Sequence, residues 1–188
     1  MSPILSSPPL VEPVSLSEAR AHLRVTHADD DDYISTLIKT ARASVEAETG
    51  HCLVAQGWSV FLDDWPHCGI ISLPLSPVMD VIDIRAYGED DVAAVIDPAH
   101  YYTDKASRPP RIVLRGSRNW TRPGRVANGI EILAVVGFGT AAASVPQPLR
   151  EAVLQLVGFW YATRGDGGAS ERPLGIARLL QPYRRPRL

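Results

Sequence analysis

Apolar residues recur at steps of three and four along two stretches of the chain, which is the spacing of one helix face. The first stretch covers about residues 30–49 and ends at Gly50, a residue suited to the left-handed turn that stops a helix. The second stretch covers 149–163 and follows Pro146 and Pro148. We expect these two helices to pack together. The residues predicted to make this contact are Ile34, Leu37, Ile38, Val45 and Leu156.

Local signals predict two shorter helices and the start of a long one. Ser15-Leu-Ser-Glu18 has the S-x-x-E pattern of a capping box, and it predicts a helix that extends to about Arg24. The four carboxylates at 29–32 precede the long helix, where the positive end of the helix dipole favours them. A last short helix is predicted over about 175–180.

Between about residues 54 and 138 the hydrophobic period changes to two, which is the spacing of β-strands. Turn signals such as Leu75-Ser-Pro77 separate the apolar runs. Strands are expected near residues 54–62, 70–73, 78–84, 92–96, 111–114 and 129–138. Short strands that follow one another closely indicate an antiparallel sheet and not β-α-β repeats. The predicted fold class is therefore α+β, a small bundle of three to four helices with an inserted antiparallel β module.

Three regions are expected along the chain. Residues 1–14 contain four prolines and little periodicity, so they are predicted to form an extended N-terminal arm. Residues 15–163 are predicted to form one domain, in which helices at 15–50 and 146–163 flank the β insertion. Residues 164–188 begin with a glycine-rich flexible joint and continue through the short helix into a C-terminal tail.

Composition excludes several classes of protein. With 188 residues, the chain is long enough for one domain or two small ones. Because no run of 18 apolar residues is present, no membrane-spanning segment and no membrane partner are expected. The first residues lack the basic and apolar regions of a signal peptide, and two cysteines are too few for a disulfide scaffold. A cytoplasmic setting is therefore expected.

The net charge of −2 conceals an uneven distribution of charged residues. Residues 1–94 carry 5 basic and 15 acidic side chains, a net charge of −10. Residues 95–188 carry 14 basic and 6 acidic side chains, a net charge of +8. Such a chain suits a subunit that binds head-to-tail or bridges two unlike partners. The alternative interpretation is that both charged surfaces are only solvated.

The candidate ligand-binding motifs are weak. Gly137-Phe-Gly139-Thr-Ala-Ala142 follows a strand and has the G-x-G-x-x-A form, but Pro146 and Pro148 delay the helix that a dinucleotide-binding loop needs. His51-Cys52 and His67-Cys68 lack the spacing of a metal clip, and neighbouring residues on a strand point to opposite faces. A turn at the strand end and small buried thiols are the simpler interpretations. No cofactor and no metal are expected.

The acidic clusters do not predict a catalytic or calcium site. Asp29–Asp32 lacks the glycine and the distal glutamate of a calcium loop, so it is interpreted as the start of a helix. Asp63 and Asp64 have no partner opposite them for acid–base chemistry. The chain is not expected to be an enzyme.

The C-terminal tail carries a stronger signal, because residues 172–188 contain no acidic side chain. Its clustered arginines are Arg178, Arg184, Arg185 and Arg187, and its apolar anchors are Tyr183 and Leu188. Pro182 and Pro186 prevent a continuous helix, so we expect residues 181–188 to be mobile in the free protein and ordered on a partner. Such a segment can bind nucleic-acid phosphates or enter a protein groove. The remaining interpretation is a solvated terminus.

Short segments along nearly the whole chain carry a resemblance to a known family. The N-terminal ones are Val14-Ser-Leu-Ser-Glu-Ala-Arg-Ala-His-Leu-Arg-Val25, the Asp-Asp-Asp-Asp-Tyr-Ile segment that follows it, and Val45-Glu-Ala-Glu-Thr-Gly50. The later ones are Leu73-Pro-Leu-Ser-Pro-Val78, Val136-Gly-Phe-Gly139, Val145-Pro-Gln-Pro-Leu-Arg-Glu-Ala-Val153, Phe159-Trp-Tyr161 and Leu180-Gln-Pro-Tyr-Arg-Arg-Pro-Arg-Leu188. In this order they resemble the head–tail connector (adaptor, head-completion) family of long-tailed double-stranded DNA phages and gene transfer agents. The chain is most similar to the variant with a β insertion between the second and third helices.

The resemblance implies a non-enzymatic structural subunit. Members of the family form a homo-oligomeric ring, commonly a dodecamer, beneath the portal protein of the particle. They extend the channel for double-stranded DNA, without sequence specificity, toward the stopper or tail-side neck protein. The implied location is the particle neck, after assembly in the bacterial cytoplasm. The residues implied to dock on the portal are Pro182, Tyr183, Arg184, Arg185, Pro186, Arg187 and Leu188.

Two other functions stay open at this point. The arginine-rich C-terminal half also suits a small nucleic-acid-binding protein, whose affinity would fall steeply with salt. A nucleotide-dependent enzyme acting through Gly137 and Gly139 would be stabilised by its cofactor, which would raise its melting temperature.

Overall fold

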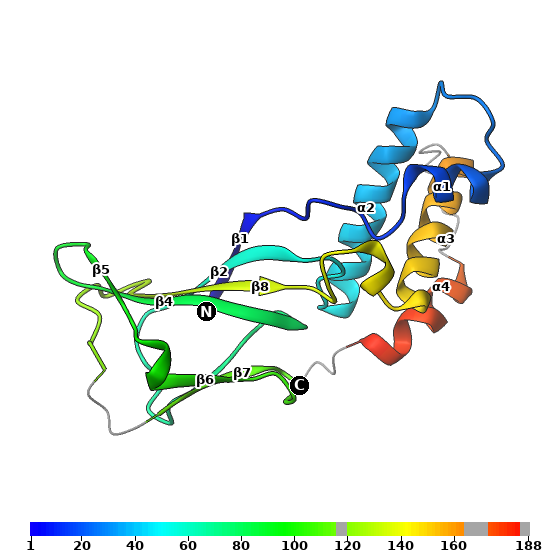
Figure 1. The fold of residues 1–188 in the computed structure, drawn as a ribbon. Coiled ribbons are helices and arrows are strands. Elements are labelled where there is room, and N and C mark those ends of the chain that lie inside the picture. The colour runs from blue at the N-terminus through cyan, green and yellow to red at the C-terminus, as the bar shows by residue number, and fades with distance from the viewer. Residues whose placement is uncertain (116–119, 164–172, 185–188) are drawn as a thin grey trace. The chain divides into compact units, whose positions relative to one another are not determined.

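The chain forms two compact units, named here the β unit and the helical unit and described separately (Figure 1). The β unit comprises Met1–Leu10 and Ala55–Gly137, and the helical unit comprises Val11–Val54 and Phe138–Leu188. The computed structural model describes the whole chain except residues 116–119, 164–172 and 185–188. Among the described residues, no helix is both long and apolar enough to cross a membrane.

Four α-helices make up the described part of the helical unit (Figure 1). They are α1 (Leu16–Leu23), α2 (Asp31–Thr49), α3 (Gln147–Thr163) and α4 (Leu174–Leu180). Single 3₁₀ turns precede α3 (η2, Ala142–Ser144) and follow α4 (η3, Gln181–Tyr183). The long helices α2 and α3 pack along each other, and α4 packs against α3. The unit is therefore a small bundle centred on α2 and α3.

Local sequence explains where the first two helices begin and end. The Glu18 backbone N–H donates to the Ser15 hydroxyl (3.2 Å), and the Glu18 carboxylate accepts from the Ser15 backbone N–H (2.8 Å), so the predicted capping box is present. Arg24 ends α1 in the left-handed conformation, with φ of 57°. Gly50 ends α2 in the same conformation, and its N–H donates to the carbonyl of Glu46.

The apolar stripes of the helices meet in one core. The five residues predicted to pack the helices, Ile34, Leu37, Ile38, Val45 and Leu156, are all buried in this cluster. The short helix α4 adds Ile176 and Leu180, which are fully buried against the same core. Burying a side chain of this size contributes about 1.5–3 kcal/mol relative to leaving it in water.

The β unit contains a five-stranded sheet in which every neighbouring pair is antiparallel (Figure 1). The strands, in spatial order, are β1 (Ser2–Ser7), β2 (Gln56–Leu62), β8 (Ile130–Val136), β4 (Val78–Tyr87) and β5 (Ala93–Val95). The last strand in the sequence, β8, is central and pairs with both β2 and β4. The short strands β1 and β5 are the two edges of this sheet.

A second, three-stranded antiparallel sheet completes the β unit. It has the order β3 (Ile70–Ser72), β7 (Arg111–Leu114) and β6 (Tyr101–Asp104), and the 3₁₀ turn η1 (Pro98–His100) leads into β6. Ile130 and Ile132 of β8 form one buried cluster with Ile71 and Ile112 of the smaller sheet. The two sheets therefore bury apolar side chains in a common core, as the layers of a β-sandwich do.

The predicted α+β class, with a small helical bundle and an antiparallel β module, is confirmed. The sequence pattern misses β1 and β6. Residues 2–7 belong to the predicted extended arm, but they form an edge strand of the chain's own sheet. Pro3 argues against a strand at this position in the sequence, since proline cannot occupy a central strand. β1 tolerates it because it is an edge strand. β6 has only four residues, and they follow the turn at Asp97-Pro98.

The structure groups residues differently from the three predicted regions. Residues 1–10 lie in the β unit, and the predicted domain at 15–163 contributes to both units. The physical reason is that helices and sheets bury two separate apolar clusters. The boundaries near residues 14 and 163 stay predictions about functional regions.

The helical core gives the first testable prediction. Replacing Leu37, which is 8% exposed, by alanine leaves a cavity between α2 and its neighbours. Leu37→Ala should lower the free energy of unfolding by roughly 2–5 kcal/mol, measured by urea denaturation. The matched control is Leu174→Ala in α4, because Leu174 is 75% exposed. Equal effects of the two substitutions would contradict this description of the core.

The turn after β6 gives a second prediction, which concerns Asp104. Its carboxylate accepts hydrogen bonds from the Ser107 hydroxyl (2.7 Å), Arg111 Nε (2.8 Å) and the backbone N–H groups of Ser107 and Ala106. These donors lower the pKa of Asp104 from 3.8 to about 2, and the Ser107 hydroxyl has the largest effect. The carboxylate therefore stabilises the turn above pH 3.8, and this contribution is lost as the pH falls through about 2.

A titration followed by NMR of the Asp104 carboxyl carbon should have its midpoint near pH 2. Ser107→Ala should move the midpoint upward, toward the ordinary aspartate value, because it removes the first of these donors. An unchanged midpoint in Ser107→Ala would show that the hydroxyl does not set the pKa.

Candidate functional site

The N-terminal end of the helical unit is held by a strap, defined here as residues 11–16, that lies against the helices. A buried charge network fixes the start of the strap. Arg42 of α2 donates through Nε to Glu12 (2.8 Å) and through Nη1 to Glu46 (2.9 Å). The second carboxylate oxygen of Glu46 accepts from the backbone N–H of Leu53 (2.7 Å). One guanidinium thus joins the strap, α2 and the chain segment after α2.

The network favours the charged form of Arg42. Burial acts to lower the pKa of Arg42, but attraction to Glu46 and the hydrogen bond to Glu12 outweigh burial, so the pKa is raised above its usual value. The side chains of Arg42, Glu46 and Glu12 are only 15%, 15% and 22% exposed. Solvent therefore screens this network less than it screens an ordinary surface ion pair.

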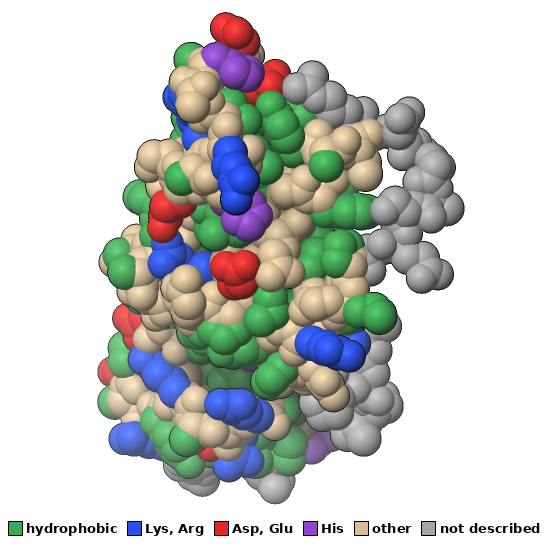
Figure 2. Space-filling model, turned by 90° about the vertical axis from the view of Figure 1, so that its right-hand side faces the viewer, with side chains coloured by type: hydrophobic (Ala, Val, Ile, Leu, Met, Phe, Trp, Pro, Cys, Tyr) green, Lys and Arg blue, Asp and Glu red, His purple; other side chains and the backbone are tan. Residues whose placement is uncertain are grey.

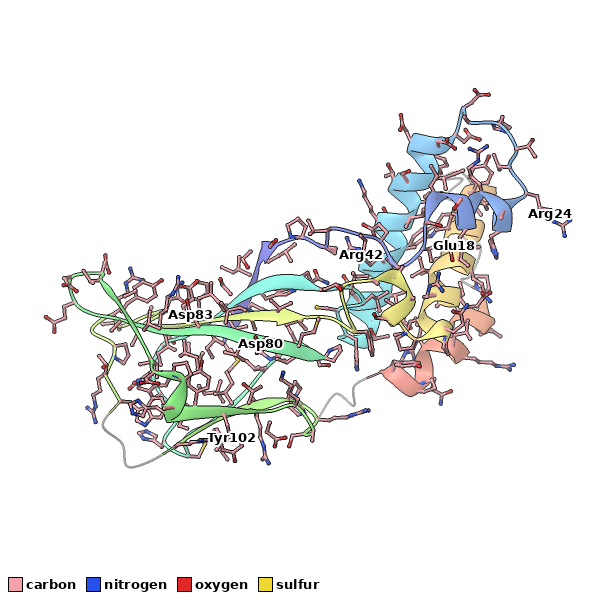
Figure 3. The ribbon with its side chains drawn as sticks, in the orientation of Figure 1. Glu18, Arg24, Arg42, Asp80, Asp83 and Tyr102 are labelled. Carbon is pink, nitrogen blue, oxygen red and sulfur yellow. The ribbon has the colours of Figure 1, made fainter. Side chains whose placement is uncertain are left out.

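A second cation, Arg150 in the first part of α3, binds the next residue of the strap and α1. Its Nε donates to the carbonyl of Pro13 (2.8 Å), and its Nη2 pairs with the Glu18 carboxylate in α1. The Ser15 backbone N–H and hydroxyl lower the pKa of Glu18, and Arg150 adds to this effect. Glu18 and Arg42 are labelled in Figure 3 on neighbouring helices of the unit. Arginines from the two central helices therefore hold two adjacent residues of the strap, Glu12 and Pro13.

An open groove of about 610 Å³ lies beside the strap in the helical unit. Its lining is mainly apolar and includes Val11, Val14 and Leu16 of the strap, Ile38 and Lys39 of α2, and Ala141. The sequence analysis did not predict this groove or the two arginine contacts. Only the i,i+4 spacing of Arg42 and Glu46 could have indicated one of them.

The C-terminal tail starts on the helical unit. Tyr183 packs against the helical core, and its ring lies edge-on to His51 with 6.5 Å between ring centroids. Arg184 donates through Nε to Glu48 of α2 (3.2 Å) and forms an ion pair with it. Pro182 is exposed within η3. Residues 183 and 184 thus have partners in the chain's own helical unit, which the sequence analysis did not predict, and the mobility of the tail stays a prediction.

The remaining predicted docking residues, Arg185, Pro186, Arg187 and Leu188, lie outside the described residues. Their role stays a prediction. The structure does show where the residue before this segment, Arg184, is bound. Arg184 is bound to Glu48, so the segment begins beside the C-terminal part of α2.

The residues of the weaker motifs have structural roles. His51 stacks on Phe138 with 6.0 Å between ring centroids, and Cys52 is buried. Cys68 is exposed, and its thiol lies 3.6 Å from the carbonyl of Ile70. Across the described parts of the chain, no three histidine, cysteine, aspartate or glutamate residues are placed to hold a metal.

The glycine motif and the acidic pairs also take part in local structure. Gly137 follows β8 with φ of 150°, and its N–H donates to the carbonyl of Pro77. The chain then passes through η2 before α3, so the motif does not lead directly into a helix as a dinucleotide loop does. Asp63 accepts from the Asn128 N–H (2.9 Å), and Asp64 accepts from the Trp65 N–H (2.7 Å).

The acidic start of α2 pairs with neighbouring helices. Asp30 occupies the N-cap position and accepts a hydrogen bond from the Tyr161 hydroxyl of α3. Asp31, in the first turn, accepts from Arg20 of α1 (3.3 Å). These contacts support the interpretation of the acidic run as a helix start.

Charged side chains are dispersed over the face shown in Figure 2. Lys and Arg side chains alternate there with hydrophobic and polar ones, and no single continuous basic patch covers this face. Two ion pairs, Arg150–Glu18 and Arg184–Glu48, join the arginine-rich C-terminal half of the sequence to the acidic N-terminal half within the helical unit. The described part of the helical unit thus presents a strap, a groove and the anchored base of the tail.

Comparisons with known proteins agree with this arrangement. Residues 13–76 match the family model of the phage gp6-like head-tail connector proteins, a range that contains residues 13–16 of the strap, α1 and α2. A search of curated protein sequences gives no match.

Solved structures give matches over the whole chain. A chain from the neck of an empty gene transfer agent (GTA) particle, computed with C6 symmetry, matches with a TM-score of 0.86 and 26% identity. This match covers 100% of the present chain and 97% of that chain. A chain from the virion of a native GTA particle matches with a TM-score of 0.84, 26% identity and the same coverage. A chain from the neck of a native GTA particle, computed with C12 symmetry, gives a TM-score of 0.79 at 26% identity, covering 98% and 97%.

The fold and the family match define a structural connector subunit. The protein is similar in residues 13–76 to the phage gp6-like head-tail connector proteins, and over its whole length to chains of gene transfer agent particles, as its sequence segments indicate. None of these comparisons supports the alternative of a small nucleic-acid-binding protein.

The network around Arg42 gives the third prediction. Arg42→Met keeps an unbranched apolar stem but leaves two poorly exposed carboxylates next to each other without their cation. The free energy of unfolding should fall by roughly 1–3 kcal/mol, less than for a fully buried pair. Arg178→Met in α4 is the control, because Arg178 is exposed and should change stability by less than about 0.5 kcal/mol.

Chemical denaturation of the three proteins at neutral pH measures both effects. If Arg42→Met and Arg178→Met were equally stable, the strap would not depend on the Arg42 network.

Proposed function

We propose that the protein forms a homo-oligomeric ring, a dodecamer, in the neck of a phage-like particle. The ring lies beneath the portal protein and joins it to a stopper or tail-side neck protein. Double-stranded DNA passes through the ring without sequence-specific contacts. In this role the protein is a non-catalytic part of the virion, and it is assembled in the bacterial cytoplasm.

The observation that carries the proposal is the match over the whole chain to a chain of a GTA particle neck. Both units and the strap take part in this match, since it covers 98–100% of the chain. A match to the GTA neck chains that covered only the helices would show only that both proteins contain a similar helical bundle. The rotational symmetry of the matched necks supports a ring, and the C12 symmetry of one of them supports twelve copies.

The C-terminal tail is the part proposed to dock on the portal. Tyr183 and Arg184 hold the base of the tail on the helical unit through the core and Glu48. Pro186 prevents residues 185–188 from continuing as a helix, and Arg185 and Arg187 supply two cations for carboxylates or carbonyls of the partner. Pro182 and Leu188 complete the docking set, with Leu188 as an apolar anchor.

Truncation of the tail tests this proposal, and the structure places the cut. A stop after Leu180 would remove the Tyr183 and Arg184 contacts together with the tail. A loss of portal binding could then come either from a damaged fold or from the missing tail. A stop after Arg184 removes only residues 185–188. This variant should keep its circular dichroism spectrum and melting temperature, while its cosedimentation with portal-containing heads should be lost.

Arg178→Ala is the matched control, because it removes an exposed arginine of the same unit and leaves the tail intact. It should bind the heads as the wild type does. Full-strength binding by the truncated protein would place the portal contact elsewhere on the chain. Failure of the wild type to bind heads at all would contradict the proposed function itself.

A further inference from the structure

The two edges of the five-stranded sheet are exposed. All six residues of β1 are exposed, and its only strand partner among the described residues is β2. All three residues of β5 are exposed as well, and β5 pairs only with β4 within the described chain. Each edge therefore presents a row of backbone N–H and C=O groups that the sheet itself does not pair.

Both edges are apolar. On β1, Ile4 is 57% exposed and Leu5 is 45% exposed. On the β5 side, Val92 and Val95 are 64% and 60% exposed. No charged side chain occurs in residues 1–11 or 92–96. Proteins that remain monomeric usually protect such edges with lysine or other charged residues. The described edges have Pro3, the register shift between Leu5 and Ser7 in β1 and the shortness of β5, but no charged side chain.

The strand registers place Ile4 of the β1 edge and Val95 of the β5 edge on the same face of the sheet. Ile4 is opposite Ser59, and Ser59 is opposite Leu133 of β8. Leu133 and Glu131 are two residues apart on one strand, so they share a face. Glu131 is opposite Arg85, and Arg85 is opposite Val95. Because directly opposed residues point the same way, Ile4 and Val95 lie on one face at opposite edges.

The middle of that face is polar and satisfies its own hydrogen bonds. Arg85 donates to Asp83 (2.8 Å), and the Tyr87 hydroxyl donates to Glu131 (2.6 Å). This second bond is the main cause of the raised pKa of Tyr87. Figure 3 labels Asp80 and Asp83 on β4, the strand next to the β5 edge. The apolar, unpaired features thus lie at the edges and not on the centre of the face.

We propose that β1 of one subunit pairs with β5 of the next copy of this chain, so that the five-stranded sheets join edge to edge around the assembly. The proposal rests on the proposed ring. A rotational ring needs two different, complementary surfaces on each subunit, and the two unlike edges of one sheet provide them. Pairing of β1 with another β1 would be self-complementary and would close a dimer.

The β6 edge of the smaller sheet is a weaker candidate. The β6 edge ends in Asp104, whose carboxylate is bound to Ser107 and Arg111. Lys105, directly after β6, donates to the backbone carbonyl of Met79. This edge therefore carries the charges that the β1 and β5 edges lack, although Tyr102 on it is as exposed as Leu5.

Cysteine cross-linking tests the proposed contact. The background is full-length Cys68→Ser, since Cys68 is exposed and Cys52 is buried. Four double variants combine Ser2→Cys or Ile4→Cys with Ala93→Cys or Val95→Cys, because these positions share one face and cover neighbouring registers. Within one subunit, four strand spacings separate β1 from β5, about 19 Å, which no disulfide can bridge. Any disulfide formed therefore joins two copies.

Rings assembled from each variant, alone or on portal-containing heads, are oxidised and analysed on denaturing gels. At least one β1–β5 pair should give a ladder of covalent oligomers. The control pair Ile4→Cys with Tyr102→Cys, at the edge of the other sheet, should stay monomeric. Rings in which only the control pair cross-links, or in which no β1–β5 pair does, would overturn the proposal.

Charge substitutions provide a second readout. Ile4→Lys should raise the concentration needed for half-assembly by about tenfold or more, because the lysine would be buried beside an apolar edge. Adding Val95→Glu to the same chain should restore assembly, since the two charges would meet across the contact. Val126→Lys, at a position 96% exposed in a loop, is the control and should assemble normally.

Electron microscopy of the wild type separates the two possible failures. If the wild type forms rings and the Ile4→Lys variant forms them equally well, the edge contact is contradicted and the proposed function is unaffected. A wild type that forms no ring under any of these conditions contradicts the proposed function, and the edge contact with it.

Discussion

Packing of α2 against α3 is the interaction on which the helical unit depends. Ile34, Leu37 and Leu156 bury the apolar stripes of these helices, and α1, α4 and the strap attach to the pair. Arg42 extends from α2 and Arg150 from α3, so the helix pair also sets where Glu12 and Pro13 of the strap are bound. Tyr183 and Arg184 fix the base of the tail on the same pair. The strap and the base of the tail are thus both positioned by the packing of α2 against α3.

In the β unit, β8 has the corresponding role. It is the central strand of the larger sheet, and Ile130 and Ile132 place it in the core shared by both sheets. A sheet built outward from a central strand must end in two edges, and here both edges are exposed and uncharged. A free monomer gains nothing from such edges, whereas a subunit surrounded by copies of itself can use them. The architecture therefore fits a protein whose working form is an assembly.

Much of the fold could be predicted because its signals are local. The stripe from Ile34 to Val45, the capping box at Ser15 and the alternation in β8 each identify an element within about ten residues. The missed strand β1 lacks such a signal, since its stability comes from pairing with β2, more than 50 residues away. The Arg42–Glu12 and Arg150–Pro13 contacts were missed for the same reason. The tail could be recognised as a distinct segment, but the sequence did not show that Tyr183 and Arg184 bind the chain's own helices.

The measurement that most directly tests the central claim is native mass spectrometry of the full-length protein, alone and mixed with the portal protein of its particle. The account predicts a closed assembly of twelve copies, on its own or on the portal, and no larger open series. The same mass should persist at high salt, because apolar and backbone contacts hold a ring more than ion pairs do. A protein that stays monomeric in both mixtures, or that forms a complex with free DNA which salt dissolves, would contradict it.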